Sequence, residues 1–160
     1  MDKLSILLIT PHADKKAILE AAIRRHVSTP TVIYTADDIF EAQSKLRNDP
    51  AKVVISDFDI GKGRCDQLIK AMKADRELRG SAVMILDSPP ERELLIDELV
   101  TGQVQFVSDW RDDRVLNHSL VRALNFASHG KKSTFYLRFL AAGDQLIKEG
   151  DKAAFVYILK

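Results

Sequence analysis

The sequence predicts a doubly wound α/β fold built on a five-stranded parallel sheet. Five short apolar runs alternate with five segments of helical periodicity between residues 4 and 127. Most of these runs are nearly continuous, which is typical of strands that covering helices bury on both faces. Turn-forming residues separate the segments. Alternation of strands and helices in this manner places a parallel sheet between two helical layers.

The first two strands and helices have clear boundaries. Residues 4–9 form an apolar run that ends at a Thr-Pro pair. Residues 16–27 carry an apolar helical stripe, and the cations of the last turn complement the helix dipole. A second strand is expected at residues 31–34. An Asp-Asp pair then caps a second helix, which an Asn-Asp-Pro sequence ends at Pro50.

The remaining elements show the same two patterns. A Pro-Pro pair suits the first turn of a helix, because backbone N–H groups there form no hydrogen bond within the helix. Gly102 suits the end of that helix. Another Asp-Asp pair leads the last helix. The expected strands lie at 53–56, 82–86 and 105–108, and the expected helices lie at 65–79, 89–102 and 112–126.

The pattern changes character after this α/β body. Residues 129–134 are polar and predict a linker. Residues 135–160 hold short apolar runs separated by Gly-Asp turns, which indicates β-structure, but two or three strands bury too little to fold alone. We therefore expect a first domain at 1–128 and the start of a second domain at 135–160, as in a fragment of a longer protein.

Composition limits the classes of function. The net charge of +1 argues against nucleic acid as a partner, and no apolar run reaches the roughly 20 residues of a membrane helix. The single cysteine, Cys65, excludes an internal disulfide and fits a reducing cytoplasm. At the start of a helix, Cys65 is expected to be a small buried residue rather than a thiol of lowered pKa. The four histidines lack the spacing of metal ligands.

Four segments at predicted strand ends carry a recognisable pattern. They are Ile-Leu-Leu-Ile-Thr-Pro (6–11), Val-Val-Ile-Ser-Asp (53–57), Val-Met-Ile-Leu-Asp-Ser (83–88) and Phe-Val-Ser-Asp-Trp (106–110). Through them the α/β body resembles the receiver domain of bacterial two-component response regulators. The resemblance implies a flavodoxin-like sheet of strand order 2-1-3-4-5 and a part in a phosphorelay. It also places Asp57 where receivers carry the aspartate that accepts a phosphoryl group.

The residues around Asp57 depart from the pattern of that family. Receivers bind Mg²⁺ through an acidic pair after the first strand, end the fourth strand with Ser or Thr, and end the fifth with Lys-Pro. Here those places hold a Thr-Pro pair, an aspartate with a serine one step on, and an Asp-Trp pair. A shift of one residue in the fourth strand would restore the serine alone. The degenerate pocket around Asp57 thus comprises Thr10, Pro11, Asp59, Asp87, Ser88, Asp109 and Trp110, with the tryptophan as a partly buried lid.

The chemistry of this pocket opposes Mg²⁺-dependent phosphorylation. Mg²⁺ prefers carboxylate and phosphate oxygens, and phosphoryl transfer needs cations near the equatorial oxygens. At adjacent strand ends, Asp57, Asp87 and Asp109 would repel one another and raise at least one pKa. We therefore expect a pseudo-receiver with no catalytic residue, no bound metal and no cofactor.

Other roles for Asp57 stay open. It caps the following loop or pairs with Lys62 or Arg64, or it holds a divalent cation together with Asp87 and Asp109, assisted by the backbone of residue 59. The alternative function is a phosphorylatable response regulator that uses Asp57 in an atypical pocket. An enzyme or a flavodoxin-like carrier finds no support, because the sequence has no Gly-rich phosphate loop and no nucleophile–base pair.

The tail resembles a second family. The run Gly-Asp-Gln-Leu-Ile-Lys-Glu-Gly-Asp (143–151) is similar to the opening strands of a cyclic-nucleotide-binding domain. That domain would be the output, but the cassette that holds the cyclic phosphate in this family lies outside these residues, so this chain is not expected to bind the nucleotide.

These resemblances imply a cytoplasmic signalling module that acts by protein contacts on its own output domain or on another protein. We also expect a weak homodimer. In receivers the fourth helix, fifth strand and fifth helix form the dimer face, and its candidates here are Leu95, Leu99, Val115 and Leu116.

Overall fold

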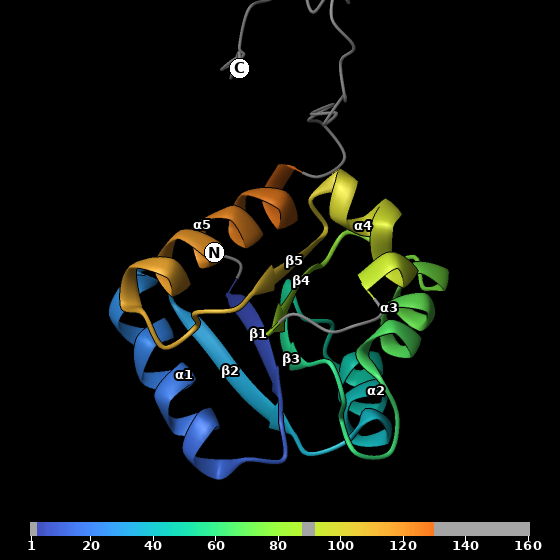
Figure 1. Cartoon of the computed structure of the whole chain (residues 1–160), viewed down its shortest axis with the longest axis horizontal. Helices are drawn as coiled ribbons and strands as arrows, with labels where there is room; N and C mark the ends of the chain where they lie inside the picture. Colours follow the sequence, from blue (N-terminus) through green and yellow to red (C-terminus); the bar gives the residue numbers. More distant parts are fainter. Residues whose placement is uncertain (1–2, 88–91, 130–160) are drawn as a thin grey trace, which may run out of the picture.

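The computed structural model describes residues 3–87 and 92–129. Within them, five parallel strands form one sheet of order β2-β1-β3-β4-β5, which confirms the predicted fold class and strand order (Figure 1). The strands are β1 Leu4–Ile9, β2 Thr31–Ala36, β3 Val53–Asp57, β4 Ala82–Leu86 and β5 Val104–Val107. The helices are α1 Ala13–His26, α2 Ile39–Asn48, α3 Cys65–Ala74, α4 Ile96–Thr101 and α5 Asp113–His129, with a 3-10 turn, η1, at Arg92–Leu95.

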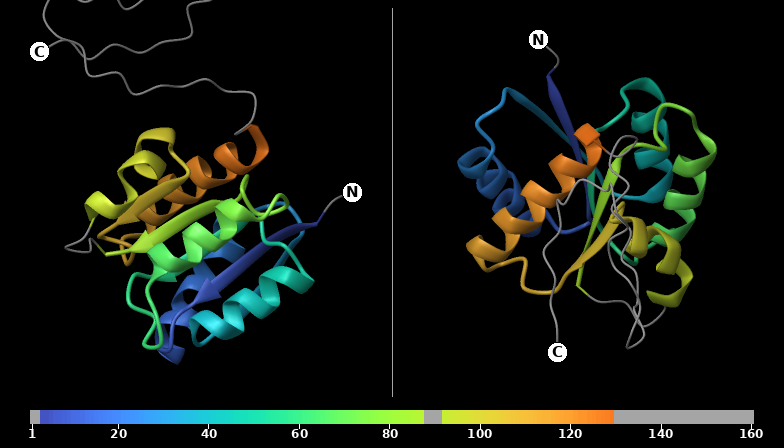
Figure 2. Two further views of the ribbon diagram at one scale, coloured as in Figure 1. Left: turned by 90° about the vertical axis from the view of Figure 1, so that its right-hand side faces the viewer. Right: turned by 90° about the horizontal axis from the view of Figure 1, so that it is seen from above.

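Helices cover both faces of the sheet. Helices α1 and α5 lie on one face, and α2, α3 and α4 lie on the other (Figures 1 and 2). The core divides accordingly into two layers, because alternate residues of the buried strands point to opposite faces. Leu8 and Ile55 pack toward α1 and α5, whereas Leu7 and Val54 pack toward α2 and α3. The near-continuous apolar runs of the sequence follow from this two-sided burial.

The structure corrects several predicted boundaries. Helix α1 begins at Ala13, three residues before the predicted start, and α3 ends at Ala74 rather than Arg79. The end of α3 has a local cause: Asp75 Oδ1 accepts the N–H of Glu77 at 2.8 Å and closes a turn. The predicted Pro-Pro helix start, the linker and the partial second domain fall outside the described residues.

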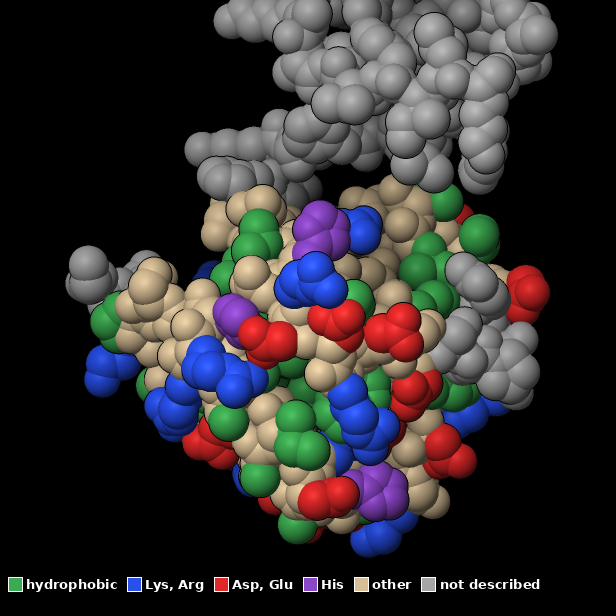
Figure 3. All heavy atoms as spheres, turned by 60° about the vertical axis from the view of Figure 1, so that its left-hand side comes forward, with side chains coloured by type: hydrophobic (Ala, Val, Ile, Leu, Met, Phe, Trp, Pro, Cys, Tyr) green, Lys and Arg blue, Asp and Glu red, His purple; other side chains and the backbone are tan. Residues whose placement is uncertain are grey.

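Charged contacts join α1 to α5. Arg25 contacts Asp113 Oδ1 at 2.9 Å, and His26 Nε2 lies 2.8 Å from Asp113 Oδ2. Arg25 and Asp113 are exposed, and His26 is half-buried. Figure 3 shows acidic and basic side chains interspersed on the side of the molecule where α1 and α5 lie. No helix in the described part of the chain is long and apolar enough to cross a membrane.

Parallel register brings the ends of the strands to one edge. Ile9 lies beside Ser56, and Asp57 lies beside Leu86. Residues that directly follow β1 and β4 therefore lie near the carboxylate at the end of β3. This carboxyl edge of the sheet is where the candidate site forms.

Candidate functional site

Asp57 is the last residue of β3 and is almost fully buried. Its Oδ1 forms an ion pair with Nζ of Lys15, which comes from the first turn of α1. The exposed fractions of the two side chains are 11% for Lys15 and 13% for Asp57. A cation therefore lies against the carboxylate, where the sequence predicted little compensating charge.

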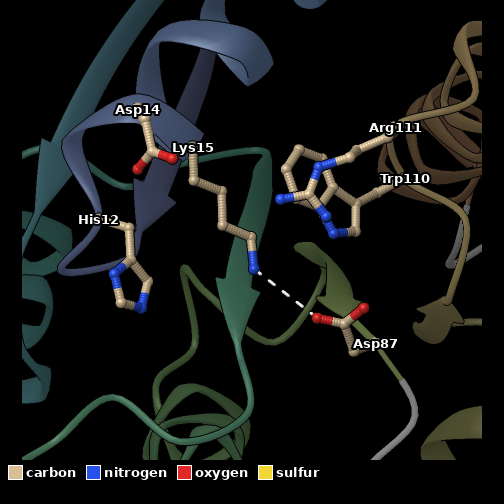
Figure 4. A pocket seen from close by; sticks show the side chains of 6 residues that line it. All are labelled: His12, Asp14, Lys15, Asp87, Trp110 and Arg111. Carbon is tan, nitrogen blue, oxygen red and sulfur yellow. Dashed lines mark ion pairs between the residues drawn. The ribbon is translucent and has the colours of Figure 1, made fainter.

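The local structure of the β1–α1 connection explains how Lys15 reaches Asp57. After β1, Thr10 Oγ1 accepts the N–H of His12 at 3.2 Å, and α1 then begins at Ala13. This short connection keeps the first turn of α1 over the carboxyl edge of the sheet (Figure 4). A cation in the first turn opposes the helix dipole, so the carboxylate partner offsets an otherwise unfavourable position.

A second carboxylate shares the same ammonium group. Asp87 directly follows β4, and its Oδ2 lies 3.7 Å from Lys15 Nζ, as the dashed line in Figure 4 shows. Unlike Asp57, it is exposed, at 65% for its side chain. Its backbone has φ of 69°, a left-handed conformation that aspartate tolerates better than most residues. The N–H of Asp87 donates to the carbonyl of Val107 at 2.9 Å, which fixes this conformation against β5.

Trp110 provides an aromatic wall beside the two carboxylates. Its side chain is buried, and Lys15 Nζ lies 4.9 Å from the ring centroid. The Arg111 guanidinium lies 4.3 Å from the same centroid. Both distances are within the range of cation–π attraction. Trp110 thus contacts two cations, rather than covering the pocket as a passive lid.

These groups surround a cavity of about 300 Å³. Figure 4 shows its lining, which is almost entirely polar or charged apart from the indole ring. The lining residues are His12, Asp14, Lys15, Asp87, Trp110 and Arg111. Only Asp87 and Trp110 of this set were predicted as pocket residues. Lys15 was not predicted as a pocket residue, because it lies on α1 and not at a strand end or in the loop after Asp57. The sequence did contain one indication: Lys15 and Lys16 lie near the start of a helix, where cations are disfavoured unless an anion lies close by.

The other predicted pocket residues lie outside the cavity lining. Thr10 is buried and bonds to its own loop, while Pro11 is exposed. Asp59 is exposed, and its Oδ1 accepts the N–H of Gly61 at 2.9 Å. Asp109 is exposed and does not line the cavity. Ser88 lies outside the described residues.

The predicted cationic partners of Asp57 are engaged elsewhere. Lys62 lies 3.1 Å from Asp38, which caps α2, and Arg64 lies 3.1 Å from the buried carboxylate of Asp66. The pairing proposed for Asp57 with either residue is therefore wrong. Its cation comes instead from the opposite face of the sheet.

The residues present do not fit a magnesium site. Thr10 and Pro11 stand where an acidic pair would be needed, and the Lys15 ammonium lies against the remaining carboxylate. Among the described residues, no group of three or more His, Cys, Asp and Glu side chains could hold a metal ion. Mg²⁺ needs near-octahedral oxygen ligands, and here an ammonium group lies against the carboxylate of Asp57 in place of such an ion.

Cys65 is buried at the first position of α3. Burial raises the pKa of its thiol to about 12, and the carboxylates of Asp66 and Asp57 act in the same direction. The thiol of lowered pKa that a helix start could produce is not found here. A protonated, inaccessible thiol has no part in nucleophilic chemistry.

Two of the predicted dimer residues are unavailable for a surface contact. Leu95 and Leu116 are buried in the core, because each faces the sheet from its helical turn. Leu99 and Val115 are partly buried against the same core layers. The exposed apolar side chains of η1, α4 and α5 are instead Leu94, Ile96 and Val121.

Solved structures with this arrangement of elements share one fold. The chemotaxis response regulator CheY4 of Vibrio cholerae matches with a TM-score of 0.64 at 16% identity, over 77% of this chain and 100% of that chain. The signal receiver domain of an HD domain-containing protein from Pseudomonas fluorescens Pf-5 matches with a TM-score of 0.66 at 18% identity, over 82% and 93%. This chain has the receiver fold.

A third receiver-fold structure, the phosphorylated cyanobacterial phytochrome response regulator RcpA, matches with a TM-score of 0.57 at 15% identity, over 78% of this chain and 92% of that chain. No protein-family model matches the sequence, and no curated protein matches it. The TM-scores establish the receiver fold. At identities this low, they do not establish the activity, which has to be argued from the site.

Proposed function

We propose that this chain is a signal-transduction module, a degenerate receiver that acts by protein contacts without Mg²⁺-dependent phosphorylation of Asp57. The ion pair between Lys15 and Asp57 is the observation that carries the proposal, in a pocket where no group of three or more His, Cys, Asp and Glu side chains among the described residues could hold a metal ion. The receiver fold supplies the signalling context.

Phosphorylation of Asp57 would work against the local charges. The acceptor oxygen would have to leave Lys15, and the new dianionic group would then lie close to the carboxylate of Asp87. Without a divalent cation to offset that charge, repulsion opposes the phosphorylated state. The buried position of Asp57 strengthens this effect, since water screens the charges less there.

One observation favours the alternative, a phosphorylatable regulator with an atypical pocket. Lys15 and the nearby Arg111 supply positive charge beside a cavity of about 300 Å³. In that reading Lys15 would move from Asp57 to an incoming phosphoryl oxygen. The cavity has room for a small phosphodonor such as acetyl phosphate.

Beryllofluoride or acetyl phosphate with Mg²⁺ distinguishes the two functions. Trp110 is the only tryptophan in the sequence and contacts Lys15, so its fluorescence reports displacement of that side chain. We expect no change in emission and no added mass. A saturable change that is absent in Asp57→Asn would establish the alternative and end the proposal. A phosphorylatable receiver treated in parallel serves as the positive control.

The partner of this module is also part of the proposal. An attached cyclic-nucleotide-binding domain remains the proposed output, based on residues 143–151 of the sequence. A weak homodimer would use the side of α4, β5 and α5, where Leu94, Ile96 and Val121 are exposed. Sedimentation that shows monomer alone at high micromolar concentration would remove the dimer from the proposal.

A further inference from the structure

Three strand ends meet at one ammonium group. Lys15 Nζ pairs with Asp57 at the end of β3, lies 3.7 Å from Asp87 after β4, and lies 4.9 Å from the ring of Trp110 after β5. These residues are far apart in sequence, and Lys15 contacts all three. The ammonium group of α1 therefore ties together the carboxyl ends of neighbouring strands.

The charges at this point are arranged as they would be around a bound cation. Two carboxylates from different strands face one positive charge, and the buried carboxylate has the closer contact. A divalent ion at the same place would have to displace Lys15, and the ammonium would then lose its partners inside a largely buried environment. Leaving a buried charge without its partner is strongly unfavourable.

We propose that Lys15 is a built-in counter-cation that takes the place of a divalent metal at this edge and couples Asp57 to Asp87 and Trp110. The inference rests on the proposed function, because it names the group that holds Asp57 unmodified. In this role Lys15 is a positioning residue: it fixes the strand ends and the indole ring in one arrangement that needs no metal.

Lys16 provides a matched control on the same helical turn. It pairs with Asp37, whose side chain is 67% exposed, and neither residue lines the cavity. Substituting Lys16→Met therefore removes the same charge from the same turn and leaves the Lys15–Asp57 pair and the cavity lining intact. A general effect of charge on α1 would appear equally in both lysine variants.

A double-mutant cycle on the full chain tests the coupling. Urea unfolding, followed by Trp110 fluorescence, is measured for wild type, Lys15→Met, Asp57→Asn, the double variant and Lys16→Met. We expect each single change at the pair to lower the folding equilibrium constant at least about tenfold, and Lys16→Met to lower it less than about fivefold. The double variant should be no less stable than the weaker of its two parents. Additive losses, or equal losses in the two lysine variants, would overturn the inference.

The cycle stays informative if Lys15→Met does not fold. Recovery of folding in the double variant would then support the inference, since Asp57 would no longer need a cation. A double variant that stays unfolded while Asp57→Asn folds would overturn it.

A metal titration of the wild-type chain provides a second readout. We expect the thermal midpoint and the Trp110 emission to be the same in MgCl₂ and in NaCl of equal ionic strength. A specific response to Mg²⁺ would contradict the inference. Neither the cycle nor this titration uses a phosphodonor, so a negative result in either one counts against the role of Lys15 alone. A positive result with beryllofluoride would instead end the proposed function.

Discussion

Lys15 and Lys16 are adjacent in the first turn of α1, yet they belong to two different regions of the molecule. Lys15 enters the cavity at the carboxyl edge and pairs with the buried Asp57. Lys16 lies at the rim near β2 and pairs with the exposed Asp37. The helix turns by about 100° between them, so Lys15, 11% exposed, reaches a buried carboxylate, and Lys16, 20% exposed, reaches an exposed one.

From this difference we expect the burial of each ion pair to decide how much it contributes to the free energy of unfolding. An exposed pair is worth about 0–1 kcal/mol, because water and salt screen it and both side chains lose freedom. A largely buried pair costs several kcal/mol when one member alone is removed. Substitutions at the Lys15–Asp57 pair should therefore lower the free energy of unfolding strongly, and substitutions at the Lys16–Asp37 pair should lower it weakly.

The largest expected effect is at Trp110, on the cavity side. Trp110→Ala should lower the free energy of unfolding by about 3–5 kcal/mol, because it removes a buried ring that contacts both Lys15 and Arg111. Phe40→Ala is the matched control, since Phe40 is an exposed aromatic on α2 and should cost under about 1 kcal/mol. Urea unfolding followed by far-UV circular dichroism measures both. Equal losses of unfolding free energy in the two variants would contradict the expected difference between the cavity and the exposed surface of α2.

An intermediate effect is expected at alkaline pH from Cys65, which is buried below the same edge. Its pKa in the folded state is about 12, above the ordinary value of 9.0, so folding favours the protonated thiol. The contribution of the protonated thiol to the free energy of unfolding is fully present below about pH 9 and is lost as the pH rises toward the folded pKa. Wild type should therefore lose more stability between about pH 8 and 10.5 than Cys65→Ala.

The same thiol should be unreactive toward a disulfide reagent in the native protein and react on unfolding. Rapid modification at neutral pH under native conditions would contradict the buried position of Cys65.

The smallest expected effect is at the surface contact between α1 and α5. The hydrogen bond with His26, together with the charges of His26 and Arg25, holds the pKa of Asp113 below its ordinary value of 3.8. The stability from this lowered pKa is present above that value and is lost as the pH falls through the folded pKa. Asp113→Asn should therefore melt slightly below wild type at neutral pH, and the two melting temperatures should converge as the pH falls below the lowered pKa of Asp113. A gap in melting temperature that persists at acid pH would show that the contact does not depend on ionisation.

Much of the fold was predictable from the sequence. Continuous apolar runs identified strands buried on both faces, and Asp38 and Gly102 marked helix ends that the structure confirms. The end of α3 was not predictable from periodicity, because Leu78 is a buried apolar residue in a turn rather than on a helix. Apolar periodicity does not distinguish these two cases.

The candidate site was less predictable than the fold. The position of Asp57 at a strand end follows from the sequence pattern, and so does the lack of an acidic pair after β1. The partner of Asp57 did not follow, since Lys15 arrives from a helix whose start was placed too late by three residues. With the helix beginning at Lys16, Lys15 lies in a loop and has no defined direction. A small error in a helix boundary therefore concealed the main electrostatic feature of the site.

Helix α1 is held by charge at both of its ends. Lys15 ties its first turn to β3, and Arg25 and His26 tie its last turn to Asp113 at the start of α5. Local opening of α1 alone would break both contacts, so fraying from either end is opposed. The amide hydrogens of α1 and α5 should therefore exchange with solvent as one cooperative unit.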